Sequence, residues 1–398
     1  MTNEVKNVPE LRFPGFEDEW KEKKLGTIFT VTMGQSPNST NYTDNPNDTI
    51  LVQGNADIYK GKIWPRIYTK EITKLLERND IILSVRAPVG EIGIAQVEAC
   101  IGRGVCSIKG NKFLYYFLDL FKKQNRWSRF SQGSTFESIS GKDIRDLKFY
   151  VCNSEEQNKI GEFFNKLDRQ IELEEEKLEL LEQQKKGYMQ KIFSQELGFK
   201  DENGNEYPTW QSYKLGNLYK KGKAGGTPKS TESKYYNGEV PFLSISDITE
   251  QGKFIMNTEK SITQEGVDNS TAWLVPVNSI NYAMYASVGY LSINKIEVAT
   301  SQAIFNMVFE DNNLVEYIYY YLNHIRDKGI LEKLVGTGTQ SNLSASIMKN
   351  MYIKLPDYEE MVKITDFLSK VDKLIEKQNQ KIDRLKEHKK GFLQKMFI

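Results

Sequence analysis

The sequence contains few of the side chains that most often carry catalysis or bind metals. Its 398 residues include only two histidines, His324 and His388, and three cysteines, Cys100, Cys106 and Cys152. The cysteines form no CxxC pair and lie in strand-like sequence, so we expect buried, reduced thiols. With so few such ligands, a zinc site is almost excluded. We interpret both histidines as surface or packing residues.

Long apolar runs are also missing. No stretch of about 18 apolar residues occurs without charges, which argues against a transmembrane helix. The first residues, MTNEVKNVPELRF, lack the basic and then apolar order of a secretory signal. We therefore expect a cytoplasmic protein, and its length fits two or three domains.

The chain has little excess charge of either sign. The net charge is +1; residues 1–154 carry 22 basic and 18 acidic side chains, whereas residues 195–358 carry 15 and 18. A duplex-binding protein usually has a basic footprint. If this chain binds DNA, its basic residues must therefore cluster locally, or partner subunits must supply part of the phosphate contact.

Recognisable catalytic motifs are absent from the sequence. The segment KGKAGGTPKS, residues 221–230, resembles a phosphate-binding loop, but Pro228 stands where that motif requires glycine before Lys229. Proline has no N–H to offer a phosphate, so we expect a loop connected to a strand. There is no GxSxG elbow, no GxGxxG motif after a strand and no Asn-Pro-Pro-aromatic motif. The pair Asp143 and Asp146 is typical of a charged surface, and the chain looks like a binding protein rather than an enzyme.

A long segment occurs twice, at a constant offset of 204 residues. EEQNKIGEFFNKLDRQIELEEEKLELLEQQKKGYMQKIF begins at Glu155, and EEMVKITDFLSKVDKLIEKQNQKIDRLKEHKKGFLQKMF begins at Glu359. Apolar residues recur in alternating steps of four and three, the period of a coiled-coil seam. The predicted seam positions are Ile160, Phe164, Leu167, Ile171, Leu178, Leu181, Tyr188 and Ile192 in the first copy and Ile364, Leu368, Val371, Ile375, Ile382, Leu385, Phe392 and Met396 in the second.

Polar residues interrupt both seams at matching steps. They are Glu174 and Lys185 in the first copy and Gln378 and Lys389 in the second. Polar residues in a seam lower stability but fix register and partner choice. Each copy would form a helix ~60 Å long at 1.5 Å per residue. Its apolar stripe requires a partner, and the other copy is the nearest one available.

The segments between the helices also repeat in order. WKEKKLG, GQSP, ILVQGNADI and ILSVRAPVG in the first half correspond to WQSYKLG, GGTP, PFLSISDI and NYAMYASVG in the second. In each half we expect an apolar strand that ends at an aspartate, Asp57 or Asp247. An aromatic helix follows from Lys112 or Leu314, and a Gly/Ser/Thr loop from Ser131 or Gly336 then leads to the long helix.

These patterns predict a mixed α+β fold made of two globular α/β units and two long antiparallel coiled-coil helices with internal pseudo-two-fold symmetry. The predicted boundaries are residues 1–154 and 195–358 for the globular units, and residues 155–194 and 359–398 for the helices.

The sequence resembles the specificity (S) subunit of Type I restriction–modification systems. The resemblance covers nearly the whole chain and depends on the repeated order together with GGTPKS, SVRAPVG, GSTFESIS, GTGTQSNLS and the EEQNKIGEFF and EEMVKITDFL helix starts. It implies a non-catalytic subunit for host defence and DNA methylation. Each globular unit would be a target recognition domain for one half of a split DNA site, and the helices would set the spacer.

The resemblance also implies partners and their cofactors. The helices would dock two modification (methyltransferase) subunits that carry S-adenosylmethionine, and two motor-nuclease subunits that use ATP and Mg²⁺ would join the restriction complex. We expect no cofactor or metal on this chain itself and no membrane partner.

Candidate DNA contacts follow from the side chains that read base edges or phosphates from loops. In the first unit they are Gln35, Ser36, Lys60, Lys62, Arg66, Arg86, Arg103, Ser131, Gln132 and Ser134. In the second unit they are Lys223, Thr227, Lys229, Ser230, Ser244, Ser246, Tyr282, Tyr285, Ser301, Gln302, Thr339 and Gln340.

Two other interpretations of the sequence remain open. A coiled-coil scaffold with two ligand-binding modules would lack sequence-specific DNA binding. A self-contained restriction enzyme would methylate or cut DNA alone, and the missing methyltransferase and nuclease motifs disfavour it.

Overall fold

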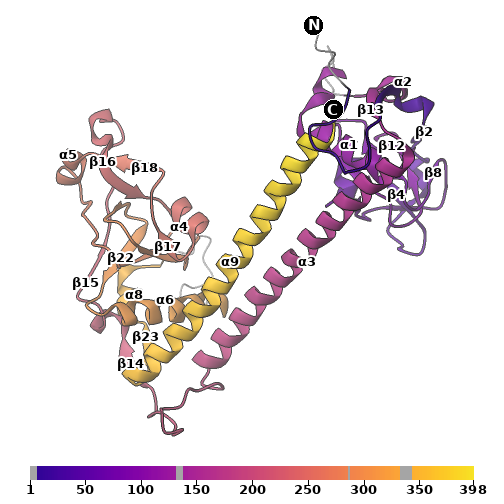
Figure 1. Ribbon diagram of the computed structural model, residues 1–398. Coiled ribbons are helices and arrows are strands. Elements are labelled where there is room, and N and C mark those ends of the chain that lie inside the picture. Colours follow the sequence, from indigo (N-terminus) through magenta and orange to yellow (C-terminus); the bar gives the residue numbers. More distant parts are fainter. Residues whose placement is uncertain (1–6, 131–137, 286, 332–342) are drawn as a thin grey trace. The chain divides into compact units, whose positions relative to one another are not determined.

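The computed structural model describes residues 7–130, 138–285, 287–331 and 343–398. The chain forms two compact units: unit 1 comprises Met1–Glu176 and Asn379–Ile398, and unit 2 comprises Lys177–Gln378. Two long helices, α3 (Ser154–Phe193) and α9 (Tyr358–Met396), each contribute one part to either unit (Figure 1). The predicted mixed fold with long helices is confirmed, and each compact unit includes parts of both helices.

Unit 1 contains two sheets and two strand pairs in its described residues. One sheet has the order β10-β9-β12-β2 and the other β3-β7-β4-β11-β8, with β1 beside β13 and β5 beside β6. The strands are β1 (Lys21–Lys24), β2 (Thr30–Met33), β3 (Tyr42–Thr43), β4 (Thr49–Val52), β5 (Ile58–Tyr59), β6 (Lys62–Ile63), β7 (Tyr68–Thr69), β8 (Leu75–Leu76), β9 (Ile81–Ser84), β10 (Ile92–Ile94), β11 (Ala99–Ile101), β12 (Val105–Lys109) and β13 (Lys148–Val151).

The helices of unit 1 build its core. The predicted aromatic helix is α1 (Lys112–Lys123), whose N-terminus is capped by the Asn111 side chain, and the short α2 (Gly141–Asp146) follows. The apolar face of α1 is buried against the sheet and against the first turns of α3, where Phe164 is completely buried. Burial of large aromatic rings is the main favourable term in such a core.

Unit 2 repeats this plan with differences: its described residues form two sheets and one strand pair, and two additional helices come before its aromatic helix. Its sheets are β15-β22-β19-β20-β17 and β18-β16-β21, with β14 beside β23. The strands are β14 (Gln211–Lys214), β15 (Lys221–Ala224), β16 (Tyr236–Leu243), β17 (Phe254–Ile255), β18 (Lys260–Ile262), β19 (Ile280–Ala283), β20 (Leu291–Asn294), β21 (Ala299–Thr300), β22 (Ile304–Val308) and β23 (Tyr352–Leu355). Its helices are α4 (Ile245–Gln251), α5 (Gln264–Asp268), the predicted aromatic helix α6 (Asn312–Asp327) and α8 (Ala345–Asn350).

The long helices run antiparallel within each unit, as their ion pairs show. In unit 1 Lys389 pairs with Asp168, and Lys381 with Glu174. In unit 2 Lys185 pairs with Asp372 at 2.6 Å. The two lysines that interrupt the predicted seams are thus neutralised by an aspartate on the opposite helix. Most predicted seam side chains are buried or half-buried, and Tyr188 is the exception at 38% exposed.

The offset of 204 residues holds for contacts outside the helices as well. The Tyr116 hydroxyl donates to Asp168 in unit 1, and the Tyr320 hydroxyl donates to Asp372 in unit 2. Burial, followed by the neighbouring aspartate, raises the pKa of both phenols far above the ordinary range. Each aspartate therefore joins a lysine of the opposite helix to a tyrosine of the adjacent globular core.

The C-terminal end of each long helix enters the core of one unit. Phe397, at the end of the second repeat, contacts the rings of Phe113 and Phe117 in unit 1, at centroid distances of 5.0 and 6.4 Å. In unit 2, Phe193 makes the equivalent contacts with Tyr317 and Tyr321, at 5.7 and 5.2 Å. The repeated sequence thus encodes both the helix pairing and its attachment to a globular core.

One local prediction was wrong. Asp57 and Asp247 do not end strands; each lies in a short helical turn and accepts backbone hydrogen bonds there. The amides of the N-cap residues Gly54 and Ser244 donate to them, at 3.1 and 2.8 Å. These bonds satisfy amides that the first turn of a helix leaves without partners.

The three cysteines are buried free thiols, as predicted. Burial raises the pKa of Cys106 to about 12. None of the helices in the described residues is long and apolar enough to cross a lipid bilayer.

Candidate nucleic-acid interface

In unit 1, the Gly-x-Ser-Pro turn that follows β2 lies against the loop between β11 and β12. The Gly34 amide donates to the Val105 carbonyl at 3.0 Å, and the Gln35 amide donates to the Ile101 carbonyl at 2.9 Å. A Cβ at Gly34 would overlap the carbonyl oxygen of Gly102, so only glycine permits this approach. The Ser36 hydroxyl then accepts the Arg103 amide at 3.1 Å.

Unit 2 places its Gly-Gly-Thr-Pro turn in the same way. The Gly225 amide donates to the Ile304 carbonyl and the Gly226 amide to the Thr300 carbonyl, at 3.2 and 2.8 Å. The Thr227 hydroxyl donates to the Gln302 side chain at 2.7 Å. We call these two loop pairs the reading turns, residues 34–37 with 101–104 and residues 225–228 with 300–303.

The reading turns present side chains suited to nucleic acid. Gln35 and Arg103 are exposed and Ser36 is half-buried in unit 1; Thr227 and Gln302 are exposed in unit 2. Guanidinium, amide and hydroxyl groups on a rigid loop can hydrogen bond to base edges or phosphate oxygens. The structure therefore brings together predicted residues that lie more than 60 residues apart in the sequence.

The other predicted residues of unit 1 lie partly on the β5–β6 hairpin. Lys60 is at its exposed tip with φ 48°, and Lys62 pairs with Glu172 of α3 at 2.8 Å. The Arg66 guanidinium lies 3.8 Å from Asp57. Arg86 is exposed at the end of β9, before a cis Ala87–Pro88 bond. These cations are accessible, although Lys62 and Arg66 each have an acidic neighbour.

The predicted residues of unit 2 are more varied. Ser301 is half-buried beside Gln302, and a second set of predicted residues is exposed, namely Lys223, Lys229, Ser230, Ser246 and Tyr285. The Ser244 hydroxyl caps α4 by accepting from the Asp247 amide at 3.3 Å. Tyr282 is completely buried in the core, which favours a packing role over the predicted DNA contact.

Five predicted residues lie outside the described part of the chain: Ser131, Gln132, Ser134, Thr339 and Gln340.

An exposed aromatic pair in unit 1 was not predicted from the sequence. Tyr59 and Trp64 flank the β5–β6 hairpin, are 56% and 57% exposed, and contact each other edge to face at a centroid distance of 5.7 Å. The Lys60 ammonium group lies over the Tyr59 ring at 5.8 Å. Alternation of Tyr59, Lys60, Lys62 and Trp64 around Gly61 was the available signal, because the tight turn at Gly61 brings the flanking side chains together.

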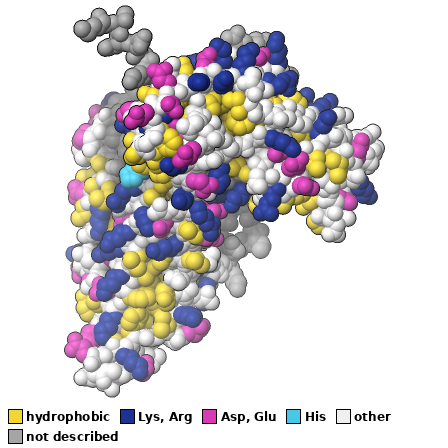
Figure 2. Space-filling view, turned by 45° about the vertical axis from the view of Figure 1, so that its right-hand side comes forward, with side chains coloured by type: hydrophobic (Ala, Val, Ile, Leu, Met, Phe, Trp, Pro, Cys, Tyr) yellow, Lys and Arg dark blue, Asp and Glu magenta, His cyan; other side chains and the backbone are white. Residues whose placement is uncertain are grey.

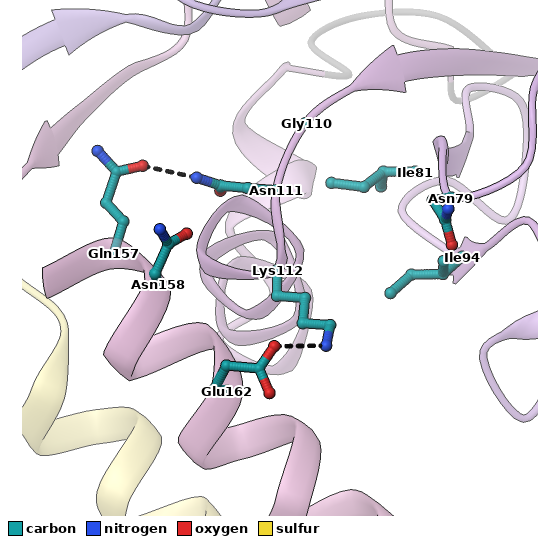
Figure 3. A pocket seen from close by; sticks show the side chains of 9 residues that line it. All are labelled: Asn79, Ile81, Ile94, Gly110, Asn111, Lys112, Gln157, Asn158 and Glu162. Carbon is teal, nitrogen blue, oxygen red and sulfur yellow. Dashed lines mark hydrogen bonds and ion pairs between the residues drawn. The ribbon is translucent and has the colours of Figure 1, made fainter. Parts of the chain in front are cut away.

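A pocket of about 290 Å³ lies elsewhere in unit 1, where β9, β10 and the start of α1 meet α3 (Figure 3). Two pairs of its polar side chains bond to each other: the Asn111 amide donates to Gln157 and the Lys112 ammonium to Glu162, at 2.7 and 2.8 Å. Asn79 and Asn158 also line the pocket.

Surface charge agrees with the low net charge of the sequence. Lys and Arg side chains are interspersed with Asp and Glu on the face in Figure 2. The distinguishing property of the reading turns is a rigid backbone that carries exposed hydrogen-bonding side chains.

Comparison with known proteins gives a consistent result. The family model described as "Type I restriction modification DNA specificity domain" matches residues 17–183 and 207–387. A putative type I restriction enzyme specificity subunit, MjaX of Methanocaldococcus jannaschii, is 32% identical over 208 residues, which cover 50% of this chain and 46% of that protein. The MjaIX specificity subunit of the same organism is 29% identical over 48% of this chain and 46% of its own length. The chain thus matches about half the length of these curated relatives.

Two solved structures have the same fold over almost the whole chain. An S subunit of a Type-I restriction-modification system from M. genitalium has a TM-score of 0.59 at 16% identity and covers 98% of this chain and 99% of its own. A second chain, from work on complex assembly and conformational transition of the type I R-M system, has a TM-score of 0.60 at 18% identity, with 97% and 98% covered. Together with the two family matches, one to each half, these likenesses show that this chain belongs to the Type I restriction–modification DNA specificity family.

Proposed function

We propose that this chain is the DNA-recognition subunit of a Type I restriction–modification complex and that each unit reads one half of a bipartite site. The observation that supports this most directly is the repeated reading turn. Both units fix the same loop pair with equivalent backbone bonds, and yet they present different side chains, Arg103 in one and Gln302 in the other. A shared support with different reading groups is what a split, asymmetric DNA site requires.

The long helices suit a second role in this proposal, as a ruler between the half-sites. Half-sites that are read from one side of B-DNA lie roughly 34–36 Å apart. A helix of 40 residues such as α3 is ~60 Å long at 1.5 Å per residue, which is sufficient for that separation.

The proposal extends to partners and location. Two modification subunits with S-adenosylmethionine would bind along the helices, two motor-nuclease subunits with ATP and Mg²⁺ would complete the restriction complex, and the location would be cytoplasmic. Reduced buried thiols are compatible with that compartment. Several apolar side chains on the helices are exposed, among them Leu173, Leu180 and Leu374, which supports a docking surface for protein.

The first test measures binding of duplex DNA by the complex of this chain with its modification subunit. Arg86→Ala and Lys229→Ala remove exposed cations near the two reading turns, one in each unit. Each should weaken binding, the first through one half-site and the second through the other. A lost phosphate contact should lower the slope of log K against log salt by about one.

Arg78→Ala and Lys349→Ala are matched controls, because both cations are exposed and lie away from the reading turns in sequence. They should leave affinity nearly unchanged at moderate salt. If the complex with the unaltered chain shows no sequence preference at all, the coiled-coil scaffold becomes the better interpretation. If it prefers a bipartite site and neither Arg86→Ala nor Lys229→Ala affects binding, the site residues are wrong and the function stands.

A further inference from the structure

Arg103 and Gln302 occupy the same position in the two units. Each lies two residues before an interior strand of the main sheet, β12 or β22, and is hydrogen-bonded to the Ser or Thr of the reading turn. This equivalence comes from the backbone bonds of the turns, since the local sequences, IGRGV and TSQAI, share no residue at matching places.

The backbone around Arg103 is held rigidly. A Cβ at Gly104 would overlap the Gln53 carbonyl oxygen, and a Cβ at Gly102 would lie 3.1 Å from the Ser36 hydroxyl. Arg103 is therefore the exposed residue between two glycines that must approach neighbouring segments closely. Its guanidinium makes no ion pair or side-chain hydrogen bond with the residues that the structure describes.

Gln302 is held by a different device, a set of side-chain hydrogen bonds. The Thr300 hydroxyl donates to buried Asn306 at 2.8 Å, and the Asn306 amide donates to buried Asn281 at 2.9 Å. At the surface, Thr227 donates to Gln302 Oε1. This bond orients the amide of Gln302 and leaves its Nε2 donors and the second lone pair of Oε1 available.

The guanidinium of Arg103 and the side-chain amide of Gln302 are each suited to one kind of base edge. Arginine bonds in a bidentate way to O6 and N7 of guanine in the major groove, and glutamine to N6 and N7 of adenine. We propose that Arg103 selects a guanine in the half-site read by unit 1 and that Gln302 selects an adenine at the corresponding place in the half-site read by unit 2. This inference depends on the proposed function and adds the bases that the two reading turns recognise.

A phosphate contact is the competing role for Arg103, and the two roles differ in a measurable way. A residue that reads a base sets the preference at one position of the site. A residue that binds phosphate weakens all sequences about equally and contributes to the salt dependence. The experiment therefore has to measure preference at each position in addition to overall affinity.

The test is a selection in which the complex of this chain and its modification subunit binds duplexes from a randomised library. The variants are Arg103→Gln, Gln302→Arg and Arg103→Ala. Arg103→Gln should change one guanine of the first half-site to adenine, and Gln302→Arg should change one adenine of the second half-site to guanine. Arg103→Ala should reduce discrimination at that single position by about 5- to 150-fold and retain the preferences elsewhere.

Arg78→Gln is the matched control, because it makes the same chemical change at an exposed arginine away from the turn; the selected site should not change. If Arg103→Ala keeps every base preference and only lowers affinity uniformly, the inference about Arg103 is wrong. The inference is also overturned if a variant that co-purifies with the modification subunit selects the unaltered bases. By contrast, absence of any bipartite site with the unaltered chain would contradict the proposed function itself.

Discussion

Four residues inserted into each long helix at the level where the two units divide should lengthen the spacer of the DNA site. The insertion points are between Glu176 and Lys177 in α3 and between Gln378 and Asn379 in α9. At 1.5 Å per residue the helices grow by ~6 Å. One base pair rises about 3.4 Å, so the spacer should grow by one or two base pairs.

The structure explains why both helices must be changed together. The pair Lys381–Glu174 lies on the unit 1 side of the insertion points and the pair Lys185–Asp372 on the unit 2 side, so a double insertion preserves both. Four residues turn an α-helix about 40° beyond one full turn, close to the rotation of one base pair. An insertion in α3 alone shifts the helices against each other by one turn on one side of the insertion point and separates the partners of one of these pairs, so it should abolish binding.

Methylation mapping in cells that express the complex, or selection from a randomised duplex library, measures the spacer directly. The double insertion should give a longer spacer with unchanged bases in both half-sites. An unchanged spacer, or altered half-site bases with a folded complex, would refute the assignment of the helices as the ruler.

Three further predictions concern stability. Phe397→Ala should destabilise unit 1 by about 3–5 kcal/mol, measured by denaturant unfolding, because the ring is buried among the aromatic side chains of α1. Burial lowers the pKa of His324 to about 4, so its contribution to stability is present above pH 6.5 and is lost as the pH falls toward 4. His324→Leu, which matches Leu120 of unit 1, should therefore flatten the pH dependence of the melting temperature in that window. A protease site inserted at Gly204, in an exposed loop with φ +83°, should allow cleavage without separation of the fragments on gel filtration.

The elements set by local periodicity could be predicted from the sequence. The long helices and the aromatic helices α1 and α6 have apolar residues at helical spacing, and their burial needs only one face to meet a core. The role of Asp247 could also have been read, since SISD places Ser244 three residues before it, the spacing of a capping box. Asp57 offered no such signal, because Gly54 has no side chain to complete the motif.

The pairing of distant groups could not be predicted, because it depends on which surfaces meet. The lysines at the seam interruptions were expected to fix register. The sequence did not indicate that Asp168 and Asp372 would be their ion-pair partners. In the same way, Arg103 was predicted as one of many possible DNA contacts. Its special place is visible only when the Ser36 turn, 67 residues away, packs against its backbone.

The repeated contacts also show which parts of each unit are free to differ. The Leu11 amide donates to the Lys395 carbonyl in unit 1, and the Leu197 amide donates to the Lys191 carbonyl in unit 2, although only the second pair is close in sequence. The segment that packs on a helix end is therefore positioned by its hydrogen bond to that end, whether or not the two are close in sequence. The contacts that attach each unit to the long helices thus involve residues that recur with the offset of 204.

The buried strand residues below the reading turns differ between the two units. In the central strand pair, Ile82 faces Ser107 in unit 1, whereas Asn281 faces Asn306 in unit 2 and forms part of a buried hydrogen-bond network. Such a network is compatible with a core only when its polar groups bond to one another, so its members have to change together. The two units therefore differ in their interior and in their reading side chains, while the tyrosine, aspartate and lysine that join each unit to the helices are the same.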